Sequence, residues 1–162
     1  MRLRRRYLDA RSVFVIISLI VTVIYFIVGL SPARATEYEI GGVVEIPSIS
    51  LVSDVTKLDL TNEGLKTPDE IAGSYTRNNK TLLIGHSTTV FQDLDEVKLN
   101  DEIYYDGEKY KVAEITYARK EDIIMSELLK KEERDTLVLM TCAGTLLPGG
   151  DATHRLILRA IN

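Results

Sequence analysis

One apolar run near the N-terminus constrains this chain more than any other feature. Residues Val13 to Leu30 form a stretch of 18 residues without a charged side chain. As a helix that rises about 1.5 Å per residue, the stretch reaches about 27 Å, close to the thickness of a hydrocarbon core of about 30 Å. The run therefore predicts a single transmembrane helix followed by a folded part.

The charged residues beside the run predict its orientation. Five arginines precede it and one follows it closely, namely Arg2, Arg4, Arg5, Arg6 and Arg11 before and Arg34 after. The positive-inside rule makes residues 1–12 a cytoplasmic basic tail, residues 13–30 a signal anchor in the cell membrane, and everything after Leu30 extracellular. A cleaved signal peptide is the alternative, because Ala33-Arg34-Ala35 resembles a cleavage site; the usual apolar core of about 7 to 15 residues is shorter than this run.

The net charge conceals an asymmetry along the chain. The whole chain carries a formal net charge of −4, whereas residues 37–162 hold 14 Lys and Arg against 23 Asp and Glu, a net charge of −9. An acidic domain has no electrostatic reason to bind nucleic acid or anionic lipid.

One cysteine excludes an internal disulfide and a multi-cysteine metal site, and 162 residues suffice for no more than one domain.

The chain beyond the apolar run is predicted to be a short stalk followed by an all-β domain. Residues 31–42 form the stalk, and residues 43–162 are long enough for one closed core. Seven runs of β-branched and aromatic residues bounded by turn residues predict strands: Val43 to Ile46, Ile49 to Val52, Thr81 to Gly85, Glu102 to Tyr105, Lys109 to Tyr117, Thr136 to Thr141 and Arg155 to Ala160. Short strands at regular spacing favour a sandwich or a closed barrel.

Two short helices are predicted between these strands. In the segment Lys120 to Glu133, apolar residues recur at spacings of three and four, which is typical of a helix with one buried face. A second helical turn is predicted from Pro68 to Ala72, with Thr67 as its N-cap and Pro68 at the first helical position.

Two strand ends carry residues that suit covalent chemistry. Cys142 follows the apolar strand TLVLMT, and His86 follows the strand TLLIG. A lone cysteine is commonly a small buried hydrophobe and a loop histidine a solvated polar residue. An exported thiol without a partner at a strand end also suits a nucleophile, which needs an acid or base within hydrogen-bond reach. We therefore predict Cys142 and His86 as a catalytic pair.

The last strand supplies a candidate cation. In the strand HRLILRA, alternation predicts Arg155, Ile157 and Arg159 on one face. These arginines could be surface residues, or one of them could stabilise a developing oxyanion. Arg155 is the better candidate because it lies at the loop end of the strand, about 13 Å from Arg159 at about 3.3 Å per residue.

Together these residues resemble the sortases, membrane-anchored cysteine transpeptidases of bacteria with a single-membrane envelope. The resemblance covers most of residues 42–160. IPSISL resembles the family's first barrel strand, LLIGHS the stretch with the catalytic histidine, and LVLMTC the signature TLxTC, while the distance from Cys142 to THRLILRA matches the position of the catalytic arginine. Val138 stands where the signature usually has Thr, and Asn100 where Gly often precedes Asp; neither departure removes a member of the triad.

The resemblance implies a closed barrel of about eight strands and a transpeptidase mechanism. The thiolate of Cys142 would attack the Thr carbonyl of an LPxTG-like sorting signal and cleave the Thr–Gly bond through a thioester. His86 would act first as acid and then as base, and Arg155 would hold the oxyanion or orient the substrate. The partners would be LPxTG-bearing secreted proteins and an amine acceptor from peptidoglycan or a pilin-type protein. The subclass stays open.

The resemblance also suggests residues that bind the sorting signal. Thr141, Ala143 and Gly144 would line the site beside the cysteine. The loop Ala143 to Ala152 and the segment Tyr117 to Asp135 would form the walls of the substrate groove, and Ile123, Ile124 and Leu128 would contact the Leu-Pro part of the signal. Packing of these apolar side chains on the barrel is the alternative interpretation.

No cofactor and no obligatory metal are expected. Some sortases use calcium near the substrate groove, and acidic residues that could serve are Asp93, Asp95, Glu96, Glu121 and Asp122. Their spacing does not match a dedicated ligand loop, so they are interpreted as a solvated acidic surface. Two other functions stay open as alternatives: an anchored barrel that binds peptides without catalysis, and a cysteine hydrolase that releases the acyl group to water.

Overall fold

The computed structural model describes residues 18, 20, 39–59, 67–148 and 151–162. The predicted signal anchor at residues 13–30 therefore lies outside the described residues, except for Ser18 and Ile20, which are helical. Within the described residues, no helix combines the length and the apolar character needed to cross a membrane. All of the strands described belong to one compact unit, Tyr38–Asn162.

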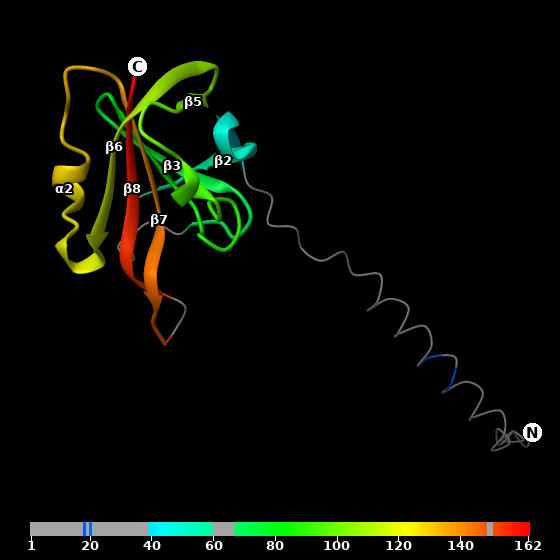
Figure 1. Cartoon of the computed structure of the whole chain (residues 1–162). Helices are drawn as coiled ribbons and strands as arrows, with labels where there is room; N and C mark the ends of the chain where they lie inside the picture. The colour runs from blue at the N-terminus through cyan, green and yellow to red at the C-terminus, as the bar shows by residue number, and fades with distance from the viewer. Residues whose placement is uncertain (1–17, 19, 21–38, 60–66, 149–150) are drawn as a thin grey trace, which may run out of the picture. The chain divides into compact units, whose positions relative to one another are not determined.

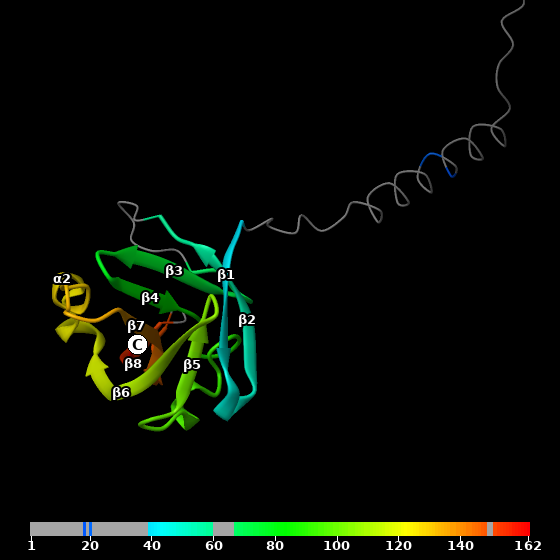
Figure 2. The same cartoon turned by 90° about the horizontal axis from the view of Figure 1, so that it is seen from above.

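Eight strands of the described residues close into a barrel, which confirms the predicted all-β fold (Figure 1). The strands are β1 (Ile40–Ile46), β2 (Leu51–Lys57), β3 (Ala72–Arg77), β4 (Lys80–Ile84), β5 (Glu102–Tyr105), β6 (Glu108–Arg119), β7 (Thr136–Leu146) and β8 (Ala152–Ile161). Their order around the barrel is β1-β2-β3-β4-β7-β8-β6-β5, seen from above in Figure 2. The pairs β2 with β3 and β4 with β7 are parallel, and the other pairs are antiparallel.

Six of these strands match predicted runs, and β3 is the strand that the sequence analysis missed. The predicted run Ile49 to Val52 overlaps β2 only at Leu51 and Val52, because Ile49 belongs to a 3-10 turn, η1 (Pro47–Ile49). In β3, the residues Ala72, Gly73 and Ser74 are buried but small, so the segment lacks the bulky β-branched residues that usually mark a strand. The Leu58 side chain packs against the backbone of Gly73, and a Cβ on Gly73 would lie 2.4 Å from Cδ1 of Leu58, so a larger residue would not fit there. β1 begins at Ile40, within the segment predicted as stalk.

The predicted helices are shorter than expected or absent. The segment predicted as one helix from Lys120 to Glu133 contains only a 3-10 turn, η3 (Lys120–Asp122), and a single helical turn, α2 (Met125–Leu128). The two β-branched residues between them, Ile123 and Ile124, have extended backbone angles, and β-branching weakens helix propensity. The turn predicted from Pro68 to Ala72 is wrong, because these residues bend and lead directly into β3.

Alternation along β7 and β8 divides their side chains between the inside and the outside of the barrel. Leu139 pairs with Leu158, and both are fully buried in the inner core. Val138 and Met140 face outward and belong to a second group, the outer cluster. The outer cluster consists of Tyr75, Leu82, Ile84, Ile123, Leu128, Leu129, Val138, Met140 and Ile157.

The connection between β6 and β7 covers this outer cluster. Ile123, Leu128 and Leu129 come from the connection, and the remaining members come from β3, β4, β7 and β8. Figure 2 shows α2, the middle of the connection, on the outside of the ring of strands. The packed apolar side chains therefore fix residues 120–134, called the connecting segment below, against the barrel wall.

Truncation of Leu158 tests the inner core. Because Leu158 is fully buried, Leu158→Ala should lower the free energy of unfolding by about 2–5 kcal/mol through lost contacts and a residual cavity. Leu99 is 55% exposed, so Leu99→Ala, the matched control, should change the free energy by less than about 0.5 kcal/mol. Urea unfolding of the full chain measures both, and equal losses would contradict the inward placement of Leu158.

Candidate active site

Parallel pairing of β4 with β7 brings His86 next to Cys142. The last paired residues are Ile84 and Met140, and the Gly85 N–H extends the pairing with a hydrogen bond of 3.3 Å to the Met140 carbonyl. Cys142 lies two residues beyond Met140 in β7 and therefore shares its outward face, because side chains alternate along a strand, whereas His86 lies in the turn two residues beyond the last residue of β4. The His86 side chain is 42% exposed and Cys142 is partly exposed, so solvent reaches both.

Thr141 joins the two strand ends. Its side chain is paired with Leu156 on the inner face, is 4% exposed, and donates a hydrogen bond of 2.8 Å from Oγ1 to the Gly85 carbonyl. The structure gives the Thr141 hydroxyl a partner within the barrel, and the expectation that Thr141 binds the substrate stays a prediction. Through this hydrogen bond, Thr141 holds Cys142 and the turn that carries His86 at a fixed separation.

The turn after β4 fixes the backbone of His86. The His86 carbonyl accepts hydrogen bonds from the N–H groups of Thr89 at 3.3 Å and Phe91 at 3.0 Å. The turn folds back closely on the preceding glycine, since a Cβ on Gly85 would lie 2.5 Å from Cγ1 of Val90 and 2.6 Å from Cδ2 of Phe91. Only glycine fits at position 85, because any side chain there would overlap Val90 and Phe91. This packing explains why a glycine directly precedes His86.

Arg155 of β8 lies opposite Cys142 in the antiparallel pairing of β7 and β8. Directly paired residues project to the same face, so the guanidinium and the thiol share the outward side. The Arg155 side chain is 15% exposed, and its Nη1 donates hydrogen bonds to the carbonyls of Ala152 at 3.0 Å and His154 at 2.9 Å. The register thus sets Arg155 opposite Cys142, and His86 follows the strand that pairs with β7 on its other side, while the catalytic triad itself stays a prediction.

Arg159, the other candidate cation, is engaged elsewhere. The predicted alternation along β8 is confirmed, because Arg155 and Arg159 pair with the outward-facing Cys142 and Val138. Arg159 lies toward the far end of the strand, where its guanidinium forms an ion pair with Glu132. The geometry therefore favours Arg155 as the cation beside the thiol.

Asp151 is a neighbour of Arg155 that the sequence analysis missed. Its Oδ1 accepts hydrogen bonds from Nη2 of Arg155 at 2.7 Å and from the Ala152 N–H at 2.8 Å, and its Oδ2 is paired with Lys120. The bonds from Lys120 and Arg155 hold the pKa of Asp151 well below its usual range, so the carboxylate stays charged. In the sequence, only its position four residues before Arg155 indicates this contact. That signal is weak, because many acidic residues in loops lie at such a distance from an arginine.

Asp69 is a second residue that no sequence pattern indicated. Its Oδ1 lies 3.8 Å from Nε2 of His86, and its carbonyl accepts a hydrogen bond of 2.5 Å from Oγ1 of Thr89. The Asp69 side chain is 97% exposed, and an exposed pair at this distance contributes little energy. Asp69 comes from the segment before β3, so its approach to His86 depends on the closed barrel.

The other predicted substrate-binding residues have different surroundings. Ala143 is half-buried and packs against the inner core, on the face opposite Cys142, so its side chain is not available to a substrate on the outer face. Gly144 has a φ of +79° at a register shift of β7, where Thr153 and His154 leave no room for a Cβ. Ile123 packs into the outer cluster, which was the alternative interpretation.

Ile124 is the exception among these residues. Its side chain is 61% exposed, so it is free to contact a partner beside the connecting segment.

Among the residues that the structure describes, no group of three or more His, Cys, Asp or Glu is arranged to hold a metal ion. Cys142, His86 and Arg155 offer a thiol, an imidazole and a guanidinium, the groups that suit a nucleophile, an acid or base, and a cation for acyl transfer.

Comparison with known proteins identifies the family. Residues 44–162 match the family model of the sortase domain, which spans most of the chain. The chain belongs to the sortase family. Sortases are cysteine transpeptidases, so the resemblance seen in the sequence motifs is confirmed at the level of the family and of its general reaction. No curated protein matches the chain.

Solved sortase structures share the fold. The lid mutant of sortase A from Corynebacterium diphtheriae is 27% identical, with a TM-score of 0.61 over 82% of this chain and 74% of that one. Sortase A from the same organism is 26% identical, with a TM-score of 0.58 over 85% of this chain and 66% of that one. Sortase C-1 from Actinomyces oris is 24% identical, with a TM-score of 0.56 over 75% of this chain and 71% of that one.

Removal of the Thr141 hydroxyl tests the link between β7 and β4. Thr141→Val keeps the shape but leaves the buried Gly85 carbonyl without this donor, so the free energy of unfolding should fall by about 1–3 kcal/mol. Thr141→Ser keeps the hydroxyl and should recover most of that loss. Thr145→Val, at an exposed position of the same strand, is the matched control in thermal unfolding. Equal stability of Thr141→Val and the wild type would refute the link.

Proposed function

We propose that this sortase cleaves an LPxTG-like sorting signal between Thr and Gly and transfers the acyl group to an amine. The observation that supports the proposal is the strand register, in which the thiol of Cys142 in β7 is paired with Arg155 in β8, and His86 follows β4, the neighbour of β7 on its other side. His86 and Cys142 are both partly exposed, so an extended peptide has access to them. A barrel that only binds peptides would not need this combination.

The first half of the reaction forms the thioester. The Cys142 thiolate attacks the Thr carbonyl carbon, and the C=O electron pair moves to oxygen, where Arg155 stabilises the negative charge. The tetrahedral intermediate then collapses and the Thr–Gly C–N bond breaks. Protonated His86 gives its proton to the departing Gly nitrogen, so a neutral amine leaves and the imidazole becomes neutral.

The second half transfers the acyl group. Neutral His86 removes a proton from the incoming amine, which attacks the thioester carbonyl. The second tetrahedral intermediate collapses with cleavage of the C–S bond, and Cys142 leaves as a thiolate. The product is a new amide, and the site returns to its starting protonation state with a protonated imidazole and a thiolate.

The proposed partners and location follow from the same chemistry. The donors are LPxTG-bearing secreted proteins, and the acceptor amine comes from peptidoglycan or from a pilin-type protein. The basic tail at residues 1–12 and the apolar run at residues 13–30 support a single-pass anchor with a cytoplasmic N-terminus. The catalytic barrel would then stand outside the membrane, where both substrates are found.

Turnover of a fluorogenic LPETG peptide by the full chain tests the transpeptidase function. We expect cleavage, a thioester adduct at Cys142 by mass spectrometry, and a product that incorporates an added amine. Cys142→Ala should abolish turnover while its thermal unfolding stays close to that of the wild type. Absence of both cleavage and adduct would indicate a peptide-binding barrel, and cleavage that is indifferent to every amine tested would indicate a hydrolase.

Arg155 is tested separately from the nucleophile. Because it faces the thiol, Arg155→Ala should lower kcat by about 100-fold or more, the usual loss when an oxyanion donor is removed. Arg134 is exposed, and Arg134→Ala is the matched control for the loss of a cation. Steady-state kinetics with the same peptide measure both variants. If Arg159→Ala lost kcat while Arg155→Ala kept it, the role would belong to Arg159.

A further inference from the structure

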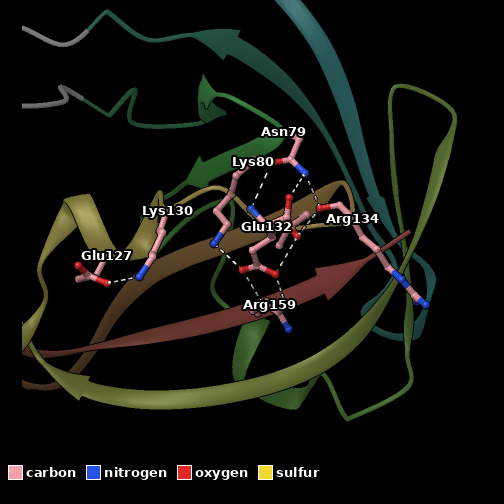
Figure 3. Close-up of polar contacts among 8 residues, drawn as sticks. Asn79, Lys80, Glu127, Lys130, Glu132, Arg134 and Arg159 are labelled. Atoms are coloured by element: carbon pink, nitrogen blue, oxygen red, sulfur yellow. Dashed lines mark hydrogen bonds and ion pairs between the residues drawn. The ribbon is translucent and has the colours of Figure 1, made fainter.

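The carboxylate of Glu132 is held between two cations that come from different strands. Its Oε1 lies 2.6 Å from Nζ of Lys80 in β4, and Nε of Arg159 in β8 donates to the same oxygen at 3.0 Å. Nη2 of Arg159 pairs with Oε2, so the guanidinium holds both carboxylate oxygens (Figure 3). Glu132 itself belongs to neither strand, because it lies near the end of the connecting segment.

Burial makes this contact more costly to break than a surface ion pair. The Lys80 side chain is only 5% exposed, and within the described residues its ammonium has one ion-pair partner, Glu132. A charge removed from water needs a partner, so Lys80 requires the carboxylate to stay in place. Hydrogen bonds from Arg159 and Lys80 lower the pKa of Glu132 to about 2, so the carboxylate is charged at any physiological pH.

The backbone of the connecting segment is held at the same point. Nδ2 of Asn79 donates hydrogen bonds of 2.8 Å to the carbonyls of Glu132 and Arg134, and Oδ1 of Asn79 accepts one of 3.4 Å from the Glu132 N–H. Oγ1 of Thr136 donates to Oε2 of Glu132 at 3.3 Å. We call this group the Glu132 clamp; its members are Asn79, Lys80, Glu132, Thr136 and Arg159.

The clamp holds one end of a segment that reaches toward the active site. The other end is held by the ion pair of Lys120 with Asp151, the residue that also binds Arg155. Between the two ends, Ile123 packs into the outer cluster together with Ile84 and Met140. Ile84 and Met140 lie two residues before His86 and Cys142, so the segment borders the face from which a peptide would approach the thiol.

A purely structural role explains the clamp poorly. A buried ion pair contributes little net stability, because desolvation of both charges offsets their attraction, and apolar residues of similar size serve a core as well. What an ion pair with several hydrogen bonds does supply is one defined position for the group it holds. The connecting segment has only one turn of α-helix of its own, so its position depends on such contacts.

We propose that the Glu132 clamp positions the connecting segment as one wall of the groove that binds the sorting signal, and thereby sets substrate affinity without touching the reacting atoms. The proposal rests on the proposed transpeptidase function for the identity of the peptide. Glu132 is a positioning residue in this mechanism. The exposed Ile124, on the same segment, is the apolar contact that the clamp holds in place for the peptide.

Glu132→Gln is the decisive variant, because it keeps the shape and removes the charge. Glu133→Gln is the matched control, since Glu133 is exposed and makes no ion pair among the described residues. Hydrogen–deuterium exchange of the full chain should rise in residues 120–134 of Glu132→Gln only. With the LPETG peptide, KM should rise about tenfold while kcat stays within about twofold, the pattern of lost binding rather than lost chemistry.

A second variant separates position from stability. In Glu132→Gln the buried Lys80 is left without its anion, so the protein could simply be less stable. The double variant Lys80→Met and Glu132→Gln removes this unpaired charge, and its thermal midpoint should return toward that of the wild type. Faster exchange of residues 120–134 and a raised KM that persist in the double variant support the positioning role. Recovery of KM together with the midpoint would refute it.

The outcomes also distinguish this proposal from the function on which it rests. Exchange is measured without substrate, so unchanged exchange in Glu132→Gln would refute the clamp whether or not the peptide is cleaved. Faster exchange with an unchanged KM would show that the segment is clamped but is not a wall of the groove, which also overturns the proposal. A wild type that cleaves no sorting peptide would refute the proposed function, and with it the assignment of the groove.

Discussion

The parallel pairing of β4 with β7 is the constraint on which the candidate site depends. It aligns the ends of two strands that are far apart in the chain, so that His86 follows β4 beside the strand that carries Cys142. A slip of one residue would turn Cys142 into the barrel, because successive side chains point to opposite faces. The hydrogen bond from buried Thr141 to the Gly85 carbonyl opposes such a slip directly beside Cys142 and His86.

The outward face of β8 extends this arrangement to the connecting segment. Arg155 and Arg159 share that face, and each binds a carboxylate, Asp151 and Glu132 respectively. Through Lys120, Asp151 also holds the start of the segment, while Glu132 lies near its end. β8 therefore organises both the cation opposite the thiol and the two attachments of the connecting segment. If the proposed function holds, the same strand links the reaction at Cys142 to the position of that segment.

Local patterns in the sequence predicted most of the barrel. Alternating apolar strands and their ends are short-range features, so Cys142, His86 and Arg155 could be recognised as residues at strand ends, and the pairing of Cys142 with Arg155 agrees with their selection as candidates. The single helical turn in the connecting segment, the inward place of Thr141 and the partners of Glu132 could not be predicted from such features. Each of these features depends on which strands become neighbours. In the connecting segment, the packing of Ile123 into the outer cluster outweighs the helix that the spacing of its apolar residues predicts.

The contacts of Arg155 show how its guanidinium can be held in one position and still have donors left to bind a ligand. Three of its five N–H groups are used, two by the carbonyls of Ala152 and His154 and one by Asp151, so the described contacts leave two donors for a ligand. Asp151 does not cancel the charge, because it is shared with Lys120 and the three groups together carry one net positive charge. In the proposed mechanism, a guanidinium held in this way would need no reorganisation when negative charge develops beside Cys142, and that absence of reorganisation is what makes electrostatic stabilisation effective.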